Sequence, residues 1–252
     1  MNPTESEDDH QLAARLAGEA GILLVALRAE MHEAGADSRE LKDEGDRQAH
    51  ELLMAALHET RPADAVLSEE GKDDQARLDA DRVWIVDPLD GTREFSEPPR
   101  SDWAVHVALV MDGVARLGAV ALPAIGETLG TGALAPTLAP PVDGPPRVIV
   151  SRTRPPEAAL TVVEAIRGRL VEMGSAGAKA MAVVRGEADV YVHSGGQYEW
   201  DSAAPVAVAE AAGLHTSRID GSPLIYNRPD PYLPDLLICR PEHADAVLEA
   251  LR

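Results

Sequence analysis

The hexapeptide Asp87-Pro88-Leu89-Asp90-Gly91-Thr92 decides the interpretation of this sequence. It directly follows the apolar run Val83–Val86, which is typical of a buried strand. Pro88 fixes φ between two carboxylates, and Gly91 lets the backbone approach a ligand closely. Paired acids at a strand end suit divalent cations. An ordinary acidic turn before a helix is the alternative interpretation of the same residues.

The length and composition predict a water-soluble protein with a substantial core. The chain has 252 residues, which is enough for one large domain or two modest ones. No uninterrupted apolar segment approaches the roughly 20 residues that a membrane span requires. The acidic segment Met1–Asp9 lacks the pattern of a secretory signal, and the single cysteine, Cys239, excludes an internal disulfide. These features predict a cytoplasmic protein with no membrane span, in which Cys239 is an apolar core residue.

The charge balance excludes one class of partner. Lys and Arg number 23 against 43 Asp and Glu, which gives a formal net charge of -20. The electrostatic field of a strongly negative protein repels polyanions, so we expect no nucleic-acid polymer as a partner. A small phosphate ester remains possible if metal ions reverse the potential locally.

The first half of the chain alternates helical and extended patterns. Apolar spacing predicts a helix over 10–28 and a second helical segment that starts near Asp46, which places Asp46 at the mouth of a helix. Strands are expected over 65–67 and 83–86, followed by a hairpin of 103–110 with 114–122. Within that hairpin, His106 is interpreted as a hydrogen-bonded sheet residue rather than a metal ligand.

A region rich in Gly, Pro, Ala and Thr, residues 126–146, is interpreted as the loop between two domains. The predicted N-terminal α+β domain covers 1–130 and carries most metal ligands, and the predicted C-terminal α/β domain covers 131–252. The second domain alternates strands and helices, which favours a sheet covered by helices. The strands are expected over 147–150, 188–192 and 236–239, and the helices over 156–171, after 174–175, over 202–212 and over 242–251.

Two further acidic motifs lie at the ends of predicted elements, Leu67–Gly71 after a strand and Glu199–Pro205 before a helix. Hard cations such as Mg²⁺ take oxygen ligands, so carboxylates on separate rigid elements can share two or three ions. Five acids would carry a charge of about -5 against about +6 for three Mg²⁺, which leaves a site that attracts phosphate. The five are Asp46, Glu69, Asp87, Asp90 and Asp201.

Taken together, seven stretches resemble the lithium-sensitive, Mg²⁺-dependent inositol monophosphatase superfamily, and within it the CysQ-type 3'(2'),5'-bisphosphate nucleotidases. The first, second and sixth carry most of the resemblance. The stretches are Glu69-Glu70, Asp87-Pro88-Leu89-Asp90-Gly91-Thr92, Trp103-Ala104-Val105-His106, Ser151-Arg152, Gly174-Ser175 with Lys179, Glu199-Trp200-Asp201, and Gly221-Ser222-Pro223-Leu224-Ile225-Tyr226-Asn227.

The resemblance implies an α/β layered sandwich, with layers in the order α-β-α-β-α, and a centre of two to three Mg²⁺ ions. It implies that the first metal is held by Glu69, Asp87 and the carbonyl of Leu89. It implies that the second metal is held by Asp87, Asp90 and Asp201, with Asp87 bridging the two. Glu70 would be an acid outside the direct ligands.

The same resemblance implies the residues around the phosphate. Gly91 and Thr92 would hold the scissile phosphate, and Thr92 with Asp46 would orient the attacking water, so that Asp46, Glu69 and Thr92 form the catalytic set. The second phosphate of a nucleotide would be bound by four residues given by family position, and Glu199 would face a sugar hydroxyl or the base. The four are Ser151, Arg152, Ser175 and Lys179.

One segment departs from the family pattern. The Val-Thr pair that usually precedes the first-loop Asp is missing, and the segment reads Lys42-Asp43-Glu44-Gly45-Asp46. Asp46 is therefore the least secure member of the site, and Asp43 or Glu44 are alternatives for part of its role. A merely solvated acidic loop is the remaining interpretation.

The resemblance implies hydrolysis of 3'-phosphoadenosine 5'-phosphate to AMP and phosphate in sulfate assimilation, by in-line attack of metal-activated water. The expected partner is a small phosphorylated nucleotide, and a homodimer is an expectation from similar proteins. Inositol monophosphatase or fructose-1,6-bisphosphatase activity is the first alternative. A non-catalytic module that binds metal or nucleotide is the second, supported only by the altered segment around Asp46.

Overall fold

The computed structural model describes residues 7–141 and 143–252. Two long antiparallel helices open the described chain, α1 (Asp9–Glu33) and α2 (Ser38–Thr60). Asp37 and Glu40 form a capping box that satisfies free N–H groups at the start of α2. The expectation that the second helix starts near Asp46 was therefore wrong, and Asp46 lies inside α2.

The first sheet has five strands in the order β1-β2-β3-β4-β5. β1 pairs in parallel with β2, and the other neighbours are antiparallel. β2 continues through the acidic hexapeptide, with a register irregularity between Asp87 and Asp90, and the short helix α3 (Thr92–Phe95) follows it. The strands are β1 (Ala65–Ser68), β2 (Val83–Asp90), β3 (Ala104–Met111), β4 (Val114–Leu122) and β5 (Glu127–Gly130).

The second sheet has the order β7-β6-β8-β10-β9 and mixes parallel and antiparallel pairs. Its strands are β6 (Arg147–Ser151), β7 (Arg169–Met173), β8 (Val190–Tyr198), β9 (His215–Ser217) and β10 (Tyr232–Cys239). Its helices are α4 (Glu157–Ala165), α5 (Ala176–Val184), α6 (Glu199–Ala211) and α7 (Pro241–Ala250). Short 3₁₀ turns complete the described chain as η1 (Gln75–Asp79), η2 (Pro123–Ile125) and η3 (Gly132–Leu134).

Two further expectations differ from the structure. The helix expected over 156–171 ends at Ala165, because Arg167 adopts a positive φ of 52° and turns the chain into β7. The segment interpreted as an inter-domain loop contains β5, which pairs with β4. In both cases pairing with a neighbouring strand decides the local structure, and strand propensity alone predicts such pairing poorly.

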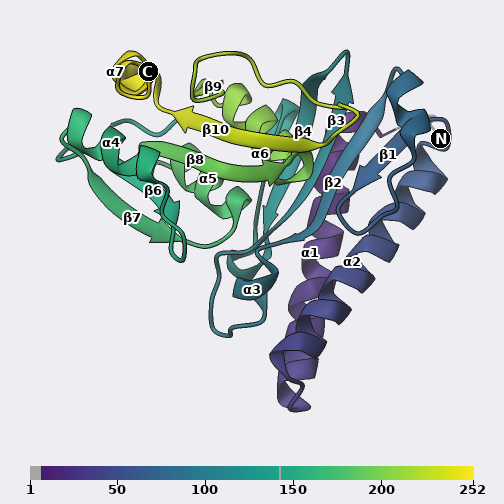
Figure 1. Ribbon diagram of the computed structural model, residues 1–252. Helices are drawn as coiled ribbons and strands as arrows, with labels where there is room; N and C mark the ends of the chain where they lie inside the picture. Colours follow the sequence, from purple (N-terminus) through teal and green to yellow (C-terminus); the bar gives the residue numbers. More distant parts are fainter. Residues whose placement is uncertain (1–6, 142) are drawn as a thin grey trace.

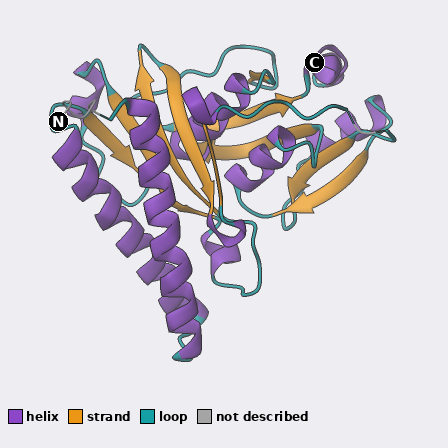
Figure 2. Ribbon diagram, turned by 180° about the vertical axis from the view of Figure 1, so that it is seen from behind, coloured by secondary structure: helices purple, strands orange, loops and turns teal. Residues whose placement is uncertain are grey.

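The elements stack in five layers (Figures 1 and 2). Helices α1 and α2 pack on one face of the first sheet, α5 and α6 lie between the two sheets, and α4 and α7 cover the outer face of the second sheet. The α-β-α-β-α sandwich is thus confirmed. None of the helices in the described ranges combines the length and apolarity that crossing a bilayer requires.

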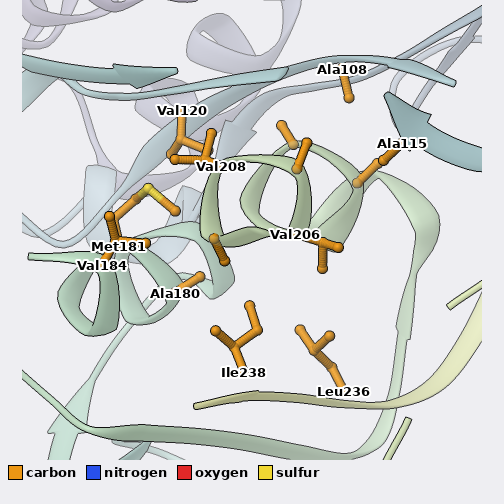
Figure 3. Packing of buried hydrophobic residues seen from close by; sticks show 14 of the residues in the cluster. Ala108, Ala115, Val120, Ala180, Met181, Val184, Val206, Val208, Leu236 and Ile238 are labelled. Atoms are coloured by element: carbon orange, nitrogen blue, oxygen red, sulfur yellow. The ribbon is translucent and has the colours of Figure 1, made fainter. Parts of the chain in front are cut away.

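The middle layer joins the two sheets through one apolar cluster (Figure 3). Helix α6 is rich in alanine and approaches β4 so closely that a Cβ on Gly118 would lie 3.0 Å from the Cα of Ala204. Cys239 is buried on β10, as expected. One apolar cluster contacts both sheets, so burial does not separate the two halves of the chain. The division into domains 1–130 and 131–252 stays a prediction. Residues that contact α5 and α6 from the two sheets include Ala108, Val120, Leu236 and Ile238.

Candidate active site

Three carboxylates converge where β2 ends and α6 begins. Asp87, Asp90 and Asp201 each offer an oxygen, and these oxygens lie within 4.8 Å of one another. Asp87 and Asp90 are buried, and Asp201 is partly buried in the first turn of α6. Two segments far apart in the sequence therefore contribute to one acidic centre, as the sequence predicts.

Burial and, after it, mutual repulsion raise the pKa values of the acids in this centre. Burial, followed by the charges of Glu69 and Asp90, raises the pKa of Asp87 well above its ordinary value. Glu69 keeps solvent contact at the end of β1, yet desolvation of its carboxyl and the nearby Asp201 raise its pKa to about 7. Burial and the charge of Asp90 raise the pKa of Asp201 to about 6. The cluster has more negative charge than its protein surroundings compensate.

Asp90 is held differently from the other acids. Its carboxylate accepts hydrogen bonds from the Ser175 hydroxyl at 2.5 Å and from two backbone N–H groups at the start of α5, those of Ala176 at 3.0 Å and Gly177 at 2.5 Å. Desolvation opposes ionisation, but the contacts with His106 and Ser175 prevail and hold the pKa of Asp90 far below its usual range. Asp90 is therefore a fixed anion.

His106 lies beneath the acidic centre on β3 and is fully buried. Its Nδ1 is 3.0 Å from the carbonyl oxygen of Trp200, next to Asp201, and its Nε2 is 3.2 Å from Asp90 Oδ2. Helix α5 can start here only because residue 177 is glycine, since a Cβ there would lie 2.0 Å from His106 Nε2. The imidazole thus connects β2 with α6, a role that the sequence analysis did not anticipate.

Asp46 reaches the site from the middle of α2. Burial, then the charges of Glu70 and Asp43, raise its pKa to about 7, and contact with the Thr92 hydroxyl partly offsets this. Gly45 makes the approach possible, because a Cβ there would lie 2.8 Å from the Phe95 ring. The Thr92 hydroxyl is also 3.1 Å from the carbonyl oxygen of Leu89 and donates to it.

The alternative acids of this segment point elsewhere. Glu44 accepts hydrogen bonds from Arg47 and Gln48 on the surface of α2. Asp43 is exposed and pairs with Arg39 at 3.6 Å. Of the three acids, Asp46 is the one in contact with Thr92.

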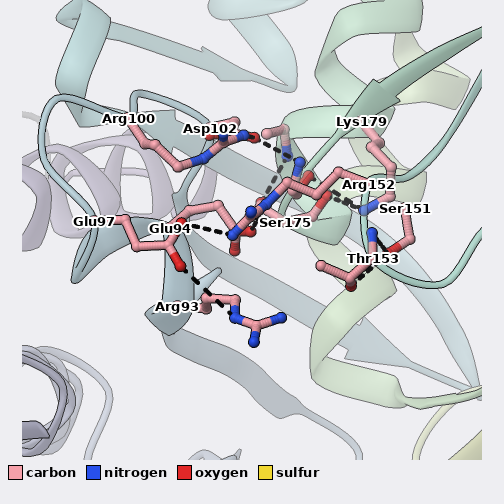
Figure 4. Close-up of polar contacts among 12 residues, drawn as sticks. Arg93, Glu94, Glu97, Arg100, Asp102, Ser151, Arg152, Thr153, Ser175 and Lys179 are labelled. Carbon is pink, nitrogen blue, oxygen red and sulfur yellow. Dashed lines mark hydrogen bonds and ion pairs between the residues drawn. The ribbon is translucent and has the colours of Figure 1, made fainter. Parts of the chain in front are cut away.

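The residues expected to bind the second phosphate divide into two groups (Figure 4). Arg152 is already paired, since its guanidinium donates to Glu94 at 2.6 Å and to Glu97 at 2.8 Å. Ser151 stays partly exposed, 3.3 Å from the Thr153 hydroxyl. Arg152 therefore joins the loop after β6 to α3, and its charge is largely compensated.

The other two expected binders, Ser175 and Lys179, are buried in the first turn of α5. Ser175 caps the helix by accepting from the N–H of Ala178 while it donates to Asp90. The Lys179 ammonium donates to the carbonyls of Gly174 and Ser175, and burial lowers its pKa. Both residues support the loop that holds Asp90.

Glu199 does not join the open side of the site, which argues against its expected contact with the sugar or base. It is 1% exposed, and its two oxygens accept from the backbone N–H groups of Asn227 at 2.6 Å and Arg228 at 2.9 Å. Arg77 of η1 binds the same loop through the side chain of Asn227. Glu199 thus fixes the loop before β10.

Arg154 is a further cation of the loop after β6, which the sequence analysis did not name. It is exposed on the loop after β6, and no carboxylate in the described residues pairs with its side chain. Its charge, with that of Lys179, acts on His193 of β8, whose pKa is lowered mainly by burial. The sequence signal was the second arginine in Ser151-Arg152-Thr153-Arg154.

The donor set fits divalent metal ions. The three groups that converge within 4.8 Å are carboxylates, whose oxygens suit hard cations. The raised pKa values of Glu69, Asp87 and Asp201 show an excess of negative charge that a cation would relieve. An acidic centre that can hold metal is therefore present.

Comparison with known proteins identifies the family. Residues 7–252 match the profile of the inositol monophosphatase family. The chain belongs to this family. It is 54% identical over 245 residues to a 3'-phosphoadenosine 5'-phosphate phosphatase of Mycobacterium bovis, a match that covers 92% of this chain and 89% of the relative. It is 31% identical over 202 residues to the 3'(2'),5'-bisphosphate nucleotidase CysQ of Shigella flexneri, covering 75% and 80%.

A solved structure in the family agrees with the fold. CysQ from Bacteroides thetaiotaomicron matches with a TM-score of 0.79 at 28% identity, covering 91% of this chain and 96% of that one. The resemblance inferred from the acidic motifs and the layered sandwich are both confirmed by these comparisons.

Proposed function

We propose that this member of the inositol monophosphatase family hydrolyses 3'-phosphoadenosine 5'-phosphate to AMP and phosphate, with Mg²⁺ as its metal and two to three ions in the site. The observation that carries the proposal is the convergence of Asp87, Asp90 and Asp201 within 4.8 Å in a chain 54% identical to a phosphatase of that name. Glu69 and the carbonyl of Leu89 complete the proposed ligand set.

The chain's own residues orient the reactants. Asp46 lies beside the Thr92 hydroxyl, which donates to the carbonyl of Leu89, and these two side chains together position the water that attacks phosphorus. The backbone N–H groups of Gly91 and Thr92 bind the scissile phosphate, where Gly91 adopts a φ of 83° and a Cβ would lie 2.9 Å from that of Ser175. When bound, the divalent cations activate the nucleophile and stabilise the leaving oxygen.

Recognition of the second phosphate is assigned to the loop after β6. Arg154 is the cation of this loop that no described carboxylate compensates, and it can offer a bidentate fork to phosphate. Ser151 adds a hydroxyl on the same loop. Arg152, Ser175 and Lys179 act indirectly, because their polar atoms already hold Glu94, Asp90 and the start of α5.

A substrate panel tests the function. Phosphate release is measured with 3'-phosphoadenosine 5'-phosphate, inositol 1-phosphate and fructose 1,6-bisphosphate, each with Mg²⁺, with Mg²⁺ plus Li⁺, and with a chelator. We expect the nucleotide to be hydrolysed fastest, with loss of activity on chelation and inhibition by Li⁺. Equal or faster turnover of inositol 1-phosphate would reassign the substrate. Nucleotide binding without any phosphate release would instead indicate a non-catalytic module.

The cellular setting belongs to the same proposal. Removal of 3'-phosphoadenosine 5'-phosphate would serve sulfate assimilation in the cytoplasm. The single cysteine of the chain agrees with a reducing compartment. A homodimer stays a prediction, which the mass of the protein in solution tests.

A further inference from the structure

Exposed aromatic side chains are rare in this protein and gather at one place. The chain has eight aromatic residues, of which five are at most 2% exposed. Tyr198 at the end of β8 is 45% exposed, Tyr232 at the start of β10 is 43% exposed, and Trp200 is partly exposed. The buried five are Trp84, Phe95, Trp103, Tyr191 and Tyr226.

The three exposed rings form an ordered group. Tyr198 lies on Trp200 with ring centroids 4.7 Å apart and planes inclined by 8°. Tyr232 is the cross-strand partner of Tyr198 and meets it edge-on, with centroids 6.1 Å apart. One face of the Tyr198 ring is therefore covered by Trp200, and the exposure of the residue lies on its remaining surface.

This group adjoins the acidic centre. The backbone N–H of Tyr198 donates to Asp201 Oδ2 at 2.7 Å, so the main chain of Tyr198 contacts the carboxylate of a proposed metal ligand. On the strand before it, a Cβ on Gly195 would meet no atom within 4 Å, whereas the Tyr232 phenol packs against Gly196. A molecule whose phosphate lies at the metal centre can reach the ring, because the hydrogen bond between Tyr198 and Asp201 places the two residues side by side.

The chemistry of the surface selects a flat, uncharged group. The exposed rings offer apolar area without a charged group, and an aromatic ring gains from stacking on a phenol backed by an indole. We propose that Tyr198, supported by Trp200 and Tyr232, is the surface on which the nucleobase of the substrate stacks. This inference rests on the proposed nucleotide phosphatase function and adds the residue that separates nucleotides from base-free sugar phosphates.

Calorimetry in Mg²⁺ with two ligands tests the inference without turnover. AMP carries a base, and ribose 5-phosphate carries the same phosphate and sugar without one. The variants are Tyr198→Ala, Tyr198→Leu, which keeps apolar bulk, and Tyr198→Phe, which keeps the ring. Ile22→Ala on α1, where Ile22 is 73% exposed, is the matched control. Thermal melting establishes that each variant is folded.

Stacking on one aromatic side chain contributes enough to change affinity about tenfold to a hundredfold. We expect Tyr198→Ala and Tyr198→Leu to weaken the binding of AMP by that factor and the binding of ribose 5-phosphate by less than about twofold. Tyr198→Phe and Ile22→Ala should bind both ligands with affinities close to those of the wild type. Unchanged AMP affinity, equal losses for both ligands, or no AMP binding to the wild type would overturn the inference. Tyr198-dependent AMP binding in an enzyme that releases no phosphate would uphold the inference and reject the proposed function.

Discussion

The carboxyl of Asp46 on α2 lies beside the hydroxyl of Thr92, the last residue of the acidic hexapeptide, and this neighbour partly offsets the rise in the pKa of Asp46. Gly45 permits this contact, because any side chain there would meet Phe95 and Leu89. This position distinguishes Asp46 from Asp43 and Glu44, the other acids of the segment that departs from the family pattern.

Replacement of that acid should remove catalysis. We expect Asp46→Asn to lower kcat by about 10² to 10⁴, the usual contribution of a group that orients or activates a nucleophile. Asp43→Asn is the matched control on the same helix and should stay within about twofold, since Asp43 is exposed and pairs with Arg39. Phosphate release from the nucleotide measures both. A larger loss in Asp43→Asn than in Asp46→Asn would transfer the role to Asp43.

His106 should act as a positioning residue for the metal centre. Removing a group that orients metal ligands typically costs 10- to 100-fold, so His106→Ala should lower kcat by that factor and raise the Mg²⁺ concentration for half-maximal activity. The KM for nucleotide should stay nearly constant. His106→Gln retains a donor toward Asp90 and should recover part of the loss. Folded variants with normal Mg²⁺ dependence would show that His106 only fills space.

Stability in the absence of metal should fall as the pH rises. The pKa values of Asp46 and Glu69 are raised to about 7 and that of Asp201 to about 6, from ordinary values near 4. An acid whose pKa is higher in the folded state disfavours folding once it ionises, so stability is lost between pH about 4 and pH about 7. With a chelator present, the melting temperature should drop by about 5 °C from pH 5 to pH 8.

The same linkage predicts the effect of Mg²⁺. The ion stabilises the folded state that binds it, and its stabilisation should be larger at pH 8, where the acids are ionised, than at pH 5. Asp201→Asn removes one of the repelling charges and should flatten the pH dependence of the metal-free protein. If Mg²⁺ raised the melting temperature equally at both pH values, the assignment of these acids to one centre would be contradicted.

Arg154 and Arg152 should differ in their effects on substrate binding. Arg154→Met should raise the KM for 3'-phosphoadenosine 5'-phosphate about tenfold or more, because a charge-assisted contact with phosphate is lost. Arg152→Met should chiefly lower the melting temperature, since it breaks the pairs with Glu94 and Glu97. A larger KM effect from Arg152→Met would restore the original prediction for that residue.

The convergence of Asp87, Asp90 and Asp201 agrees with the sequence, because each of these acids lies next to a strong local signal. Asp87 and Asp90 follow an apolar strand, and Asp201 precedes a helix, so their places at element ends follow from residue type and spacing. The sequence also holds a signal for the start of α2, since Asp37-Ser38-Arg39-Glu40 is a capping box.

Other properties depend on partners far away in the chain and cannot be read locally. Arg152 looks like a free phosphate binder until Glu94 and Glu97 are brought beside it. Glu199 looks like a substrate contact until the loop at 227–228 closes over it. Burial and pairing of this kind arise only from the tertiary fold.

The layer of α5 and α6 has a consequence for engineering. Because these helices pack on both sheets, a chimaera that joins residues 1–130 of this chain to the second half of a relative would bring together two apolar surfaces that were never selected to match. Substrate preference is better altered by grafting short loops, such as residues 151–154, because they can be exchanged without disturbing the shared interior.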